Sequence, residues 1–532
     1  MPQMYMTLLH SPSRTGSKLA ECFVNWMEIF HMKTWSAILL LSLAILPDIR
    51  AQKKSTALEK EINAFDAYAV SGMKDFRIPG MAVAVVRDGQ VIFAKAYGVR
   101  KADRPEPVDL HTQFSIGSTT KAITAVCMGM LVDEGKVRWD DPVIRYLPDL
   151  QLHDAYVTRH LRIRDLFTHN SGVGNTDFLW GEMEISSDEI IRKMAQVEPA
   201  YGFRGGFLYQ NIFYLIAGQV IEKTSGMPWH EFIKKRVFLP LGLTHTVATL
   251  ADGNRDNEAH PHYLVDGTVT VLRHSSADKV GPAGSVRSCI TDMAEWTRCM
   301  LDSSKHAGGR LLKADTWAEM FAPQVIVPES QFYPTKSLTR PSWTTYGLGW
   351  FQQDYQGRRL NFHTGSLPGE IALHAQMPSE KTGYFFLGNL DHAELRHALM
   401  YRAFDRFALA SSRDWNLEIK ALYDRLSKNQ EQAIARYFGT RVPDTRPSRS
   451  LADFIGNYAD PLRGTLTIGM KDGRLIADLN GVVTGTLEHF HYDTFVMQYP
   501  EAWMGKGLIT FHTAADGKVA KVEAGGIGFL RK

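Results

Sequence analysis

The chain has 532 residues and 44% of them are hydrophobic, so it is long enough to form more than one domain around a large buried core. Its 60 basic and 57 acidic residues give a formal net charge of +3, and the basic residues form no run. This balance argues against a nucleic-acid partner and favours small neutral or mixed substrates.

The N-terminal region contains the pattern of a secretory signal. Residues 32–51, "MKTWSAILLLSLAILPDIRA", combine a lysine, an apolar stretch of about a dozen residues and a small residue at Ala51. The apolar stretch is too short to span a membrane. We therefore expect an N-terminal extension and signal peptide over 1–51, and no stable membrane span after cleavage. The mature protein is expected to be exported, either periplasmic or secreted.

The next part of the chain predicts an α+β domain over 52–410. Residues 79–98 form two strand patterns joined by an Asp-Gly pair at 88–89, which is a strong hairpin signal. Helical and loop-rich sequence follows, and strand patterns return over 347–390 before a helix expected at 393–408. Strands at both ends with helices between them indicate one antiparallel sheet flanked by helices, with a helical insertion.

The composition changes after this domain. Residues 411–450 are a charged helical stretch followed by a segment rich in Pro, Ser and Arg, and we expect a helical linker there. Short alternating segments follow, with Asp-Gly pairs at 472–473 and 516–517. They predict a small all-β, barrel-like domain over 451–532.

The stretch "FSIGSTTKAIT" at 114–124 contains a candidate nucleophile, Ser118, three residues before Lys121. Residues at this spacing share a helix face, so the lysine amine is expected beside the hydroxyl. A Ser that only capped the helix would favour Glu or Gln at the position of Lys121. Because the following helix is apolar on almost every face, Lys121 is expected to be buried, which lowers its pKa and makes it a proton acceptor.

The same Ser-x-x-Lys spacing occurs again at Ser276 and Lys279. That copy runs into Gly-Pro-Ala-Gly at 281–284, which we do not expect to continue as a buried helix. Ser118 is therefore preferred. No Gly-x-Ser-x-Gly motif occurs, which disfavours an α/β-hydrolase nucleophile elbow.

Tyr209 and Asn211 lie in "FLYQNIFYLIAG", just before another apolar helix. A phenol near a lysine can be deprotonated near neutral pH and act as general base, and the Asn amide can orient the lysine and a substrate carbonyl. The alternative is that these residues are an aromatic packing group and a helix-capping Asn. The motif alone leaves both interpretations open.

A third element is expected on a strand that faces the nucleophile, and two segments compete for this place. Lys381 begins a Lys-Thr-Gly sequence, but it lies in a turn between two strands, so its side chain should point into solvent. His363 ends the strand "RRLNFHTG", and Gly365 and Gly369 permit a close approach of backbone to a ligand. We therefore choose His363, although a hydrogen-bonded histidine within a sheet is the alternative.

Neither a disulfide framework nor a metal site is expected. The mature chain keeps Cys127, Cys289 and Cys299, and whether the last two pair stays open. There is no His-Glu-x-x-His motif and no Cys pair at zinc spacing, so no metal or other cofactor is predicted. Two His-x-His pairs are expected in loops and strands: His260 with His262, and His489 with His491.

The three motifs together resemble the serine β-lactamase and penicillin-binding-protein family, in its class C, esterase and peptidase S12 branch. The resemblance rests on Ser118-x-x-Lys121, Tyr209-x-Asn211 and His363-x-Gly365, in this order. It covers about residues 60–408, and "RDLFTHNSG", "PAGSVRSCITDMAEW" and "HTGSLPG" look like further family landmarks. The C-terminal module resembles the lipocalin-like domains that some exported serine hydrolases carry.

The resemblance implies acyl transfer in two steps. Ser118 attacks a carbonyl, an acyl-enzyme forms, and water releases the acid. Lys121 and Tyr209 share the proton transfers, and Asn211 orients the lysine. The backbone N–H groups of Ser118 and Ser366 hold the oxyanion. The substrate and oxyanion groups of the strand are Thr364, Gly365 and Ser366.

Two departures from the family pattern bear on the substrate. His363 replaces a lysine, and an imidazole that titrates between about pH 5.5 and 8 holds a carboxylate less firmly. Gln210 stands where Ser or Ala is frequent, and its longer side chain is a candidate to narrow the cleft. We expect an exported serine hydrolase acting on esters, amides or short peptides, D-amino-acid peptides included. The alternatives are a β-lactamase or D-Ala-D-Ala carboxypeptidase, and a non-catalytic ligand-binding protein on this scaffold.

Overall fold

The computed structural model describes residues 56–532. The predicted signal peptide and its cleavage site lie outside the described residues. Every candidate site residue belongs to one compact unit, Phe65–Lys532. Within residues 56–532, no helix is both long enough and apolar enough to cross a membrane.

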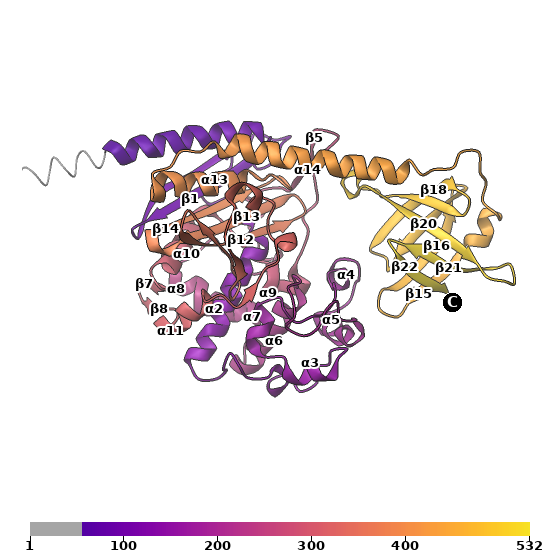
Figure 1. Cartoon of the computed structure of the whole chain (residues 1–532), viewed down its shortest axis with the longest axis horizontal. Helices are drawn as coiled ribbons and strands as arrows, with labels where there is room; N and C mark the ends of the chain where they lie inside the picture. The colour runs from indigo at the N-terminus through magenta and orange to yellow at the C-terminus, as the bar shows by residue number, and fades with distance from the viewer. Residues whose placement is uncertain (1–55) are drawn as a thin grey trace, which may run out of the picture. The chain divides into compact units, whose positions relative to one another are not determined.

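An eight-stranded antiparallel sheet forms the centre of the first domain (Figure 1). The N-terminal hairpin lies beside the strand of this sheet that comes last in the sequence. Strand β1 pairs with β14 on one side and with β2 on the other. Asp88 and Gly89 have φ of 50° and 77° at the hairpin turn, as the Asp-Gly signal predicted. In spatial order the strands are β2 (Gln90–Gly98), β1 (Gly80–Arg87), β14 (Thr382–Gly388), β13 (Glu370–Met377), β12 (Arg358–Leu367), β11 (Phe351–Tyr355), β10 (Thr344–Tyr346) and β9 (Val325–Ile326).

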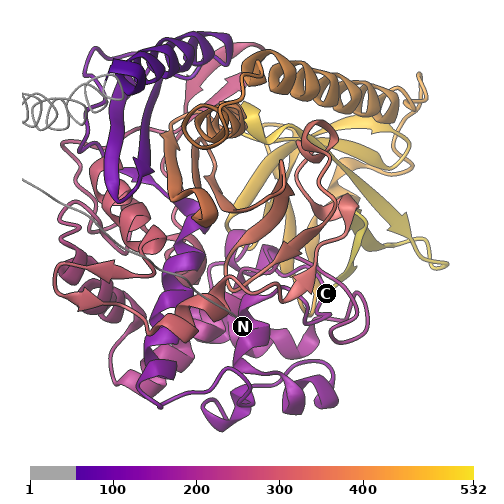
Figure 2. The same cartoon turned by 60° about the vertical axis from the view of Figure 1, so that its left-hand side comes forward.

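Helices cover both faces of this sheet. Helix α10 (Ile290–Leu301) contacts β1 and β14, and α13 (Leu395–Phe404) contacts β13 and β14 from the opposite face (Figures 1 and 2). The predicted α+β architecture is therefore confirmed. Further helices are α2 (Thr120–Asp133), α3 (Ala155–His160), α4 (Phe178–Gly181), α5 (Ser187–Lys193), α6 (Ile212–Ser225), α7 (Trp229–Ile233), α8 (Leu239–Leu241), α9 (Gly281–Gly284), α11 (Ala314–Met320), α12 (Lys336–Thr339) and α14 (Trp415–Phe438).

Helix α2 lies in the middle of the helical insertion and packs against α6 and α9. All of its residues from Thr120 to Leu131 are buried, as its apolar sequence predicts. The expectation that 281–284 would not form a buried helix is wrong, because these residues are the buried single turn α9. A Cβ on Gly218 of α6 would lie 2.4 Å from Cγ of Pro282, so the missing side chain makes room for this turn.

The C-terminal part forms a separate closed barrel, so the predicted small all-β module is confirmed. Its core is its own and includes Phe454, Tyr458 and Phe511. Eight antiparallel strands close it: β15 (Gly456–Asp460), β16 (Gly464–Lys471), β17 (Arg474–Leu479), β18 (Val483–His491), β19 (Thr494–Gln498), β20 (Lys506–Thr513), β21 (Val519–Ala524) and β22 (Ile527–Arg531). Three two-stranded sheets complete the chain: β3 (Phe114–Ser115) with β6 (Arg287–Ser288), β4 (His262–Val265) with β5 (Thr268–Val271), and β7 (Lys305–His306) with β8 (Gly309–Arg310).

Candidate active site

Ser118 lies in a single 3₁₀ turn, Gly117–Thr119, directly before α2. Lys121 is the second residue of α2, and its Nζ lies 3.0 Å from Oγ of Ser118. No side chain caps either helix start, so Ser118 is free of the capping role that a Ser usually has there. The i, i+3 spacing thus brings the hydroxyl and the amine together as predicted.

The Lys121 amine is completely buried, and its three neighbours determine where its lone pair points. Nζ lies 2.7 Å from Oδ1 of Asn211 and 2.9 Å from the carbonyl oxygen of Ala283. Both oxygens only accept hydrogen bonds, so a neutral amine donates its two hydrogens to them. The remaining lone pair is left for Ser118, whose hydroxyl is the one neighbour able to donate.

Burial lowers the pKa of Lys121 to about 7, and the carboxylate of Asp177 offsets part of this effect. A lysine amine is ordinarily charged at neutral pH, because its usual pKa is about 10.4. At this lowered pKa a large share of Lys121 is neutral near pH 7. The geometry and the pKa therefore agree that Lys121 can accept the proton of Ser118.

The hydroxyl of Tyr209 is buried and makes no hydrogen bond to other described residues. Burial raises the pKa of Tyr209 well above its ordinary value, and the nearby Ser118 lowers it only in part. The expectation that this phenol is deprotonated near neutral pH is therefore wrong. The Lys121 ammonium lies 4.8 Å from the centre of the Tyr209 ring, over its face.

Asn211 precedes α6 but does not cap it with its side chain. Its Oδ1 accepts from Lys121, and its Nδ2 donates to Oδ1 of Asp177 at 2.9 Å. The alternative of a simple helix cap is excluded. Asp177 also accepts from Nε1 of Trp180 at 2.9 Å, so it fixes the amide orientation that presents an oxygen to Lys121. Sequence reasoning missed Asp177, because it belongs to no motif and is 34 residues from Asn211.

Gln210 does not narrow the cleft, in contrast to our suggestion. Its Nε2 donates to the carbonyl oxygens of Val173 and Gly174, and its Oε1 accepts from the hydroxyl of Thr176 at 2.6 Å. These bonds turn the side chain away from Ser118. They instead tie the Tyr209–Asn211 segment to the loop that leads into Asp177.

Strand β12 passes very close to the 3₁₀ turn that carries Ser118. A Cβ on Gly365 would lie 1.9 Å from the carbonyl oxygen of Ile116, and a Cβ on Gly117 would lie 2.6 Å from the nitrogen of Ser366. Only glycine permits this approach. The backbone nitrogens of Ser118 and Ser366 thus lie on the two segments that meet at this contact.

His363 is buried on β12 in a chain of four hydrogen bonds. Its Nδ1 lies 2.6 Å from the carbonyl oxygen of Thr364, so Nδ1 carries the hydrogen, and Nε2 accepts from the hydroxyl of Tyr346 at 2.9 Å. Tyr346 in turn accepts from Nε2 of His169 at 3.2 Å, and Nδ1 of His169 accepts from the backbone N–H of Gln210. The backbone groups at the two ends set both histidines as neutral tautomers.

Burial, aided by the charge of Lys121, lowers the pKa of His363 to about 3. The expectation that His363 titrates between pH 5.5 and 8 is therefore wrong. An imidazole that stays neutral above this pKa cannot hold a carboxylate as a lysine ammonium does. His363 supplies shape and hydrogen bonding to the strand instead of charge.

The rejected motif residues lie away from this site. Lys381 is exposed, with a φ of 46°, in the turn between β13 and β14. Nζ of Lys279 donates to the carbonyl oxygen of Met183 and to Glu184 at 3.0 Å, while Ser276 accepts from the backbone of Asp278. The second Ser-x-x-Lys copy therefore forms no serine–lysine pair.

A cavity of about 430 Å³ opens onto Ser118. Tyr333, on the segment between β9 and β10, closes one side, and its hydroxyl bonds Oγ1 of Thr364 at 2.7 Å. Sequence reasoning missed this aromatic wall, although "QFYP" is an unusual aromatic cluster in a loop. The residues around the cavity are Ser118, Phe207, Tyr209, Gln331, Phe332, Tyr333, Pro334, Phe351, His363, Thr364 and Ser366.

Arg396 supports the strand from behind. Its Nη1 donates to the carbonyl oxygen of Gly365 at 3.0 Å and to Oγ of Ser366 at 2.9 Å, and its Nη2 pairs with Glu394 at 3.0 Å. The two bonds from Arg396 to Gly365 and Ser366 hold β12 in position against the start of α13. Arg396 is a positioning residue that no motif indicated.

The family model described as Beta-lactamase matches residues 65–405, which is more than half of the chain. The chain belongs to the beta-lactamase family. This family consists of serine hydrolases, and the serine, lysine, tyrosine and strand motifs of this member all lie within the matched residues. A second model, described as a domain of unknown function, matches residues 440–525 in the barrel region.

Known relatives of this family member include hydrolases and penicillin-binding proteins. The unguisins hydrolase ungD of Aspergillus violaceofuscus is 24% identical over an alignment of 447 residues that covers 78% of each chain. The putative penicillin-binding protein PbpX of Bacillus subtilis is 25% identical, over 64% of this chain and 79% of PbpX. The chain is thus similar to proteins of different named activities.

Solved structures share the fold. The octameric penicillin-binding protein homologue from Pyrococcus abyssi aligns with a TM-score of 0.56 at 21% identity, covering 87% of this chain and 98% of that one. SurE aligns with a TM-score of 0.54 at 22% identity, covering 89% and 100%. At these identities the likeness supports the fold alone.

Proposed function

We propose that the protein is a serine hydrolase in which Ser118 attacks the carbonyl carbon of an ester, amide or short peptide. The observation that carries this proposal is the buried amine of Lys121, 3.0 Å from Oγ of Ser118. Two carbonyl-type acceptors take its hydrogens, so its lone pair is available to the serine.

In the proposed reaction Lys121 takes the proton of Ser118 as the serine oxygen bonds to the substrate carbon. The oxyanion is stabilised by the N–H groups of Ser118 and Ser366. Tyr209 lines the cavity and holds a proton, so it can donate to the leaving group and recover a proton from Lys121. Water then attacks the acyl carbon while Lys121 again accepts a proton, and Lys121 returns that proton to the Ser118 oxygen as the acid is released.

The cavity favours an apolar or aromatic group next to the scissile carbonyl. Five aromatic side chains surround it, while His363 stays neutral and adds no charge. This combination disfavours a dedicated β-lactamase or D-Ala-D-Ala carboxypeptidase, whose substrates carry a carboxylate that a cation binds. Hydrolysis of esters and small peptides, D-amino-acid peptides included, is also in line with the relative named an unguisins hydrolase.

The pattern at 32–51 supports export to the periplasm or the medium. We regard the barrel as a lipocalin-like module, since eight antiparallel strands close it, as they do in lipocalins.

The test is labelling with a fluorophosphonate probe that carries a neutral aromatic group and phosphonylates a reactive serine with loss of fluoride. We expect the folded full-length protein to be labelled on Ser118, as located by peptide mass spectrometry, and the heat-denatured protein to remain unlabelled. Ser118→Ala should remove the label, and Ser276→Ala should keep it. Absence of label on the folded protein would favour the ligand-binding alternative over the enzyme.

The pH profile tests the role of Lys121 as base. Because burial sets its pKa at about 7, the neutral, reactive form increases as pH rises through that value. For a neutral ester we expect kcat/KM to rise from pH 5.5 to 8.5, about tenfold per unit on the acidic side, and then to level off. The neighbouring His363 does not disturb this range, since its pKa is about 3. A profile that stays flat between pH 5.5 and 8.5 would exclude Lys121 as the base.

A further inference from the structure

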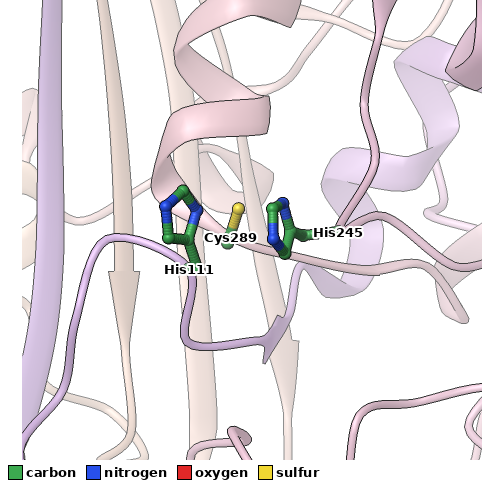
Figure 3. Close-up of side chains that lie close together, drawn as sticks. All are labelled: His111, His245 and Cys289. Carbon is green, nitrogen blue, oxygen red and sulfur yellow. The ribbon is translucent and has the colours of Figure 1, made fainter.

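Three potential metal ligands meet outside the cavity: His111, His245 and Cys289 (Figure 3). One ring nitrogen of each histidine and the sulfur of the cysteine all lie within 4.8 Å of one another. Figure 3 shows the two imidazoles on either side of the Cys289 side chain. Their rings are stacked, with centroids 4.4 Å apart. The residues come from segments far apart in sequence, so the cluster is a product of the fold.

Neighbouring oxygen atoms already orient these ligands. The hydroxyl of Thr291 lies 3.0 Å from Sγ of Cys289 and 3.2 Å from Nδ1 of His111, so it bridges two of the three. The hydroxyl of Thr244 lies 3.1 Å from Nδ1 of His245, and the carboxylate of Asp292 accepts from the backbone N–H of His245 at 2.8 Å. Metal-binding histidines ordinarily have such oxygen partners, which hold the ring orientation.

We propose that His111, His245 and Cys289 bind one Zn²⁺ ion, with water as the fourth ligand. A thiolate with two imidazoles is a ligand set that suits zinc among the divalent metals. Zinc bonds of about 2.0–2.1 Å to nitrogen and 2.3 Å to sulfur require ligand atoms roughly 3.5 Å apart in a tetrahedron. Because the ligand atoms lie within 4.8 Å of one another, the cluster has to contract by no more than about 1.3 Å. Binding releases the thiol proton to solvent.

Only the two histidine side chains can move to bring the ligand atoms closer together. Cys289 is fully buried at the start of α10, so its sulfur stays in place. His111 is exposed and the His245 side chain is 39% exposed, so both rings can rotate towards the sulfur at small cost. The exposed side also provides an entry path and a water for the open position.

The position of the cluster predicts a structural effect. His111 lies three residues before β3, and Cys289 directly follows β6, the partner strand of β3. His245 belongs to the loop whose residue Val247 bonds to the backbone of Arg287 in β6. A bound ion would therefore join three segments around the β3–β6 pair. None of the three ligands lines the cavity at Ser118, so zinc is expected to stabilise the fold without entering the reaction.

The experiment uses the full-length protein without a histidine tag, stripped with a chelator and dialysed. On adding Zn²⁺ we expect one ion per chain by elemental analysis and a higher Tm. With Co²⁺ we expect a thiolate-to-cobalt charge-transfer band in the near ultraviolet. His111→Ala should weaken Zn²⁺ binding by at least about 10-fold, and Cys289→Ser should remove the band.

Matched controls separate this site from adventitious binding. Cys299→Ser changes another buried cysteine of α10, and His153→Ala changes another exposed histidine, so both should bind Zn²⁺ as the wild type does. If Cys289→Ser does not fold, the exposed His111→Ala decides the matter. No cobalt band in the wild type, or binding unchanged in His111→Ala, would overturn the proposal.

Discussion

Replacing Ser118 by Ala, or Lys121 by Met, is expected to lower kcat/KM for a neutral ester by about 10⁴-fold, with the double variant no worse than either single one. The reason is that the two side chains act as one unit. Nζ of Lys121 lies 3.0 Å from Oγ of Ser118, and each is useful in the proposed reaction only when the other is present. The measurement is steady-state hydrolysis by all three variants, with Tm as the check on folding.

Lys381→Ala is the matched control for Lys121→Met. Lys381 belongs to a Lys-Thr-Gly sequence, but it is exposed in a turn, so its removal should change kcat/KM less than about twofold. A loss of only a few-fold in Lys121→Met would contradict the assignment of Lys121 as the base. A double variant far worse than both single ones would mean that the two residues act separately.

Local sequence patterns were sufficient to predict the central Ser118–Lys121 pair of the site. Ser118 and Lys121 are three residues apart on one helix, so the spacing alone brings them together. Order along the chain and the shared resemblance then indicated Tyr209, Asn211 and His363. The hairpin at 88–89 and the buried α2 follow from equally local signals.

Long-range geometry accounts for what the sequence could not predict. The direction in which the Gln210 side chain points depends on the carbonyl oxygens of Val173 and Gly174. No rule of sequence spacing connects these acceptors to Gln210. The neutrality of His363 follows from complete burial and from Tyr346, 17 residues earlier in the chain. A metal search by ligand spacing likewise misses His111 and its partners, because they meet only when β3 pairs with β6.

Gly365→Ala is expected to lower kcat by about 100- to 1000-fold while KM changes little, although no functional side chain is altered. The added Cβ would lie 1.9 Å from the carbonyl oxygen of Ile116 and 3.1 Å from the nitrogen of Ser118. Both neighbours are backbone atoms, so no side-chain rotation relieves the clash. The strand must move away from the nucleophile turn, and the N–H of Ser366 moves with it. A displaced donor no longer meets the oxyanion that forms at Ser118, which costs about as much as removing that donor.

Gly202→Ala is the matched control, because a Cβ there meets no heavy atom within 4 Å. It should keep kcat within about twofold of the wild type. Equal Tm values for the two variants would exclude global unfolding as the cause of the loss in Gly365→Ala. A Gly365→Ala variant with wild-type kcat would mean that the reaction does not depend on the distance between β12 and the Ser118 turn, and would remove Ser366 from the proposed oxyanion site.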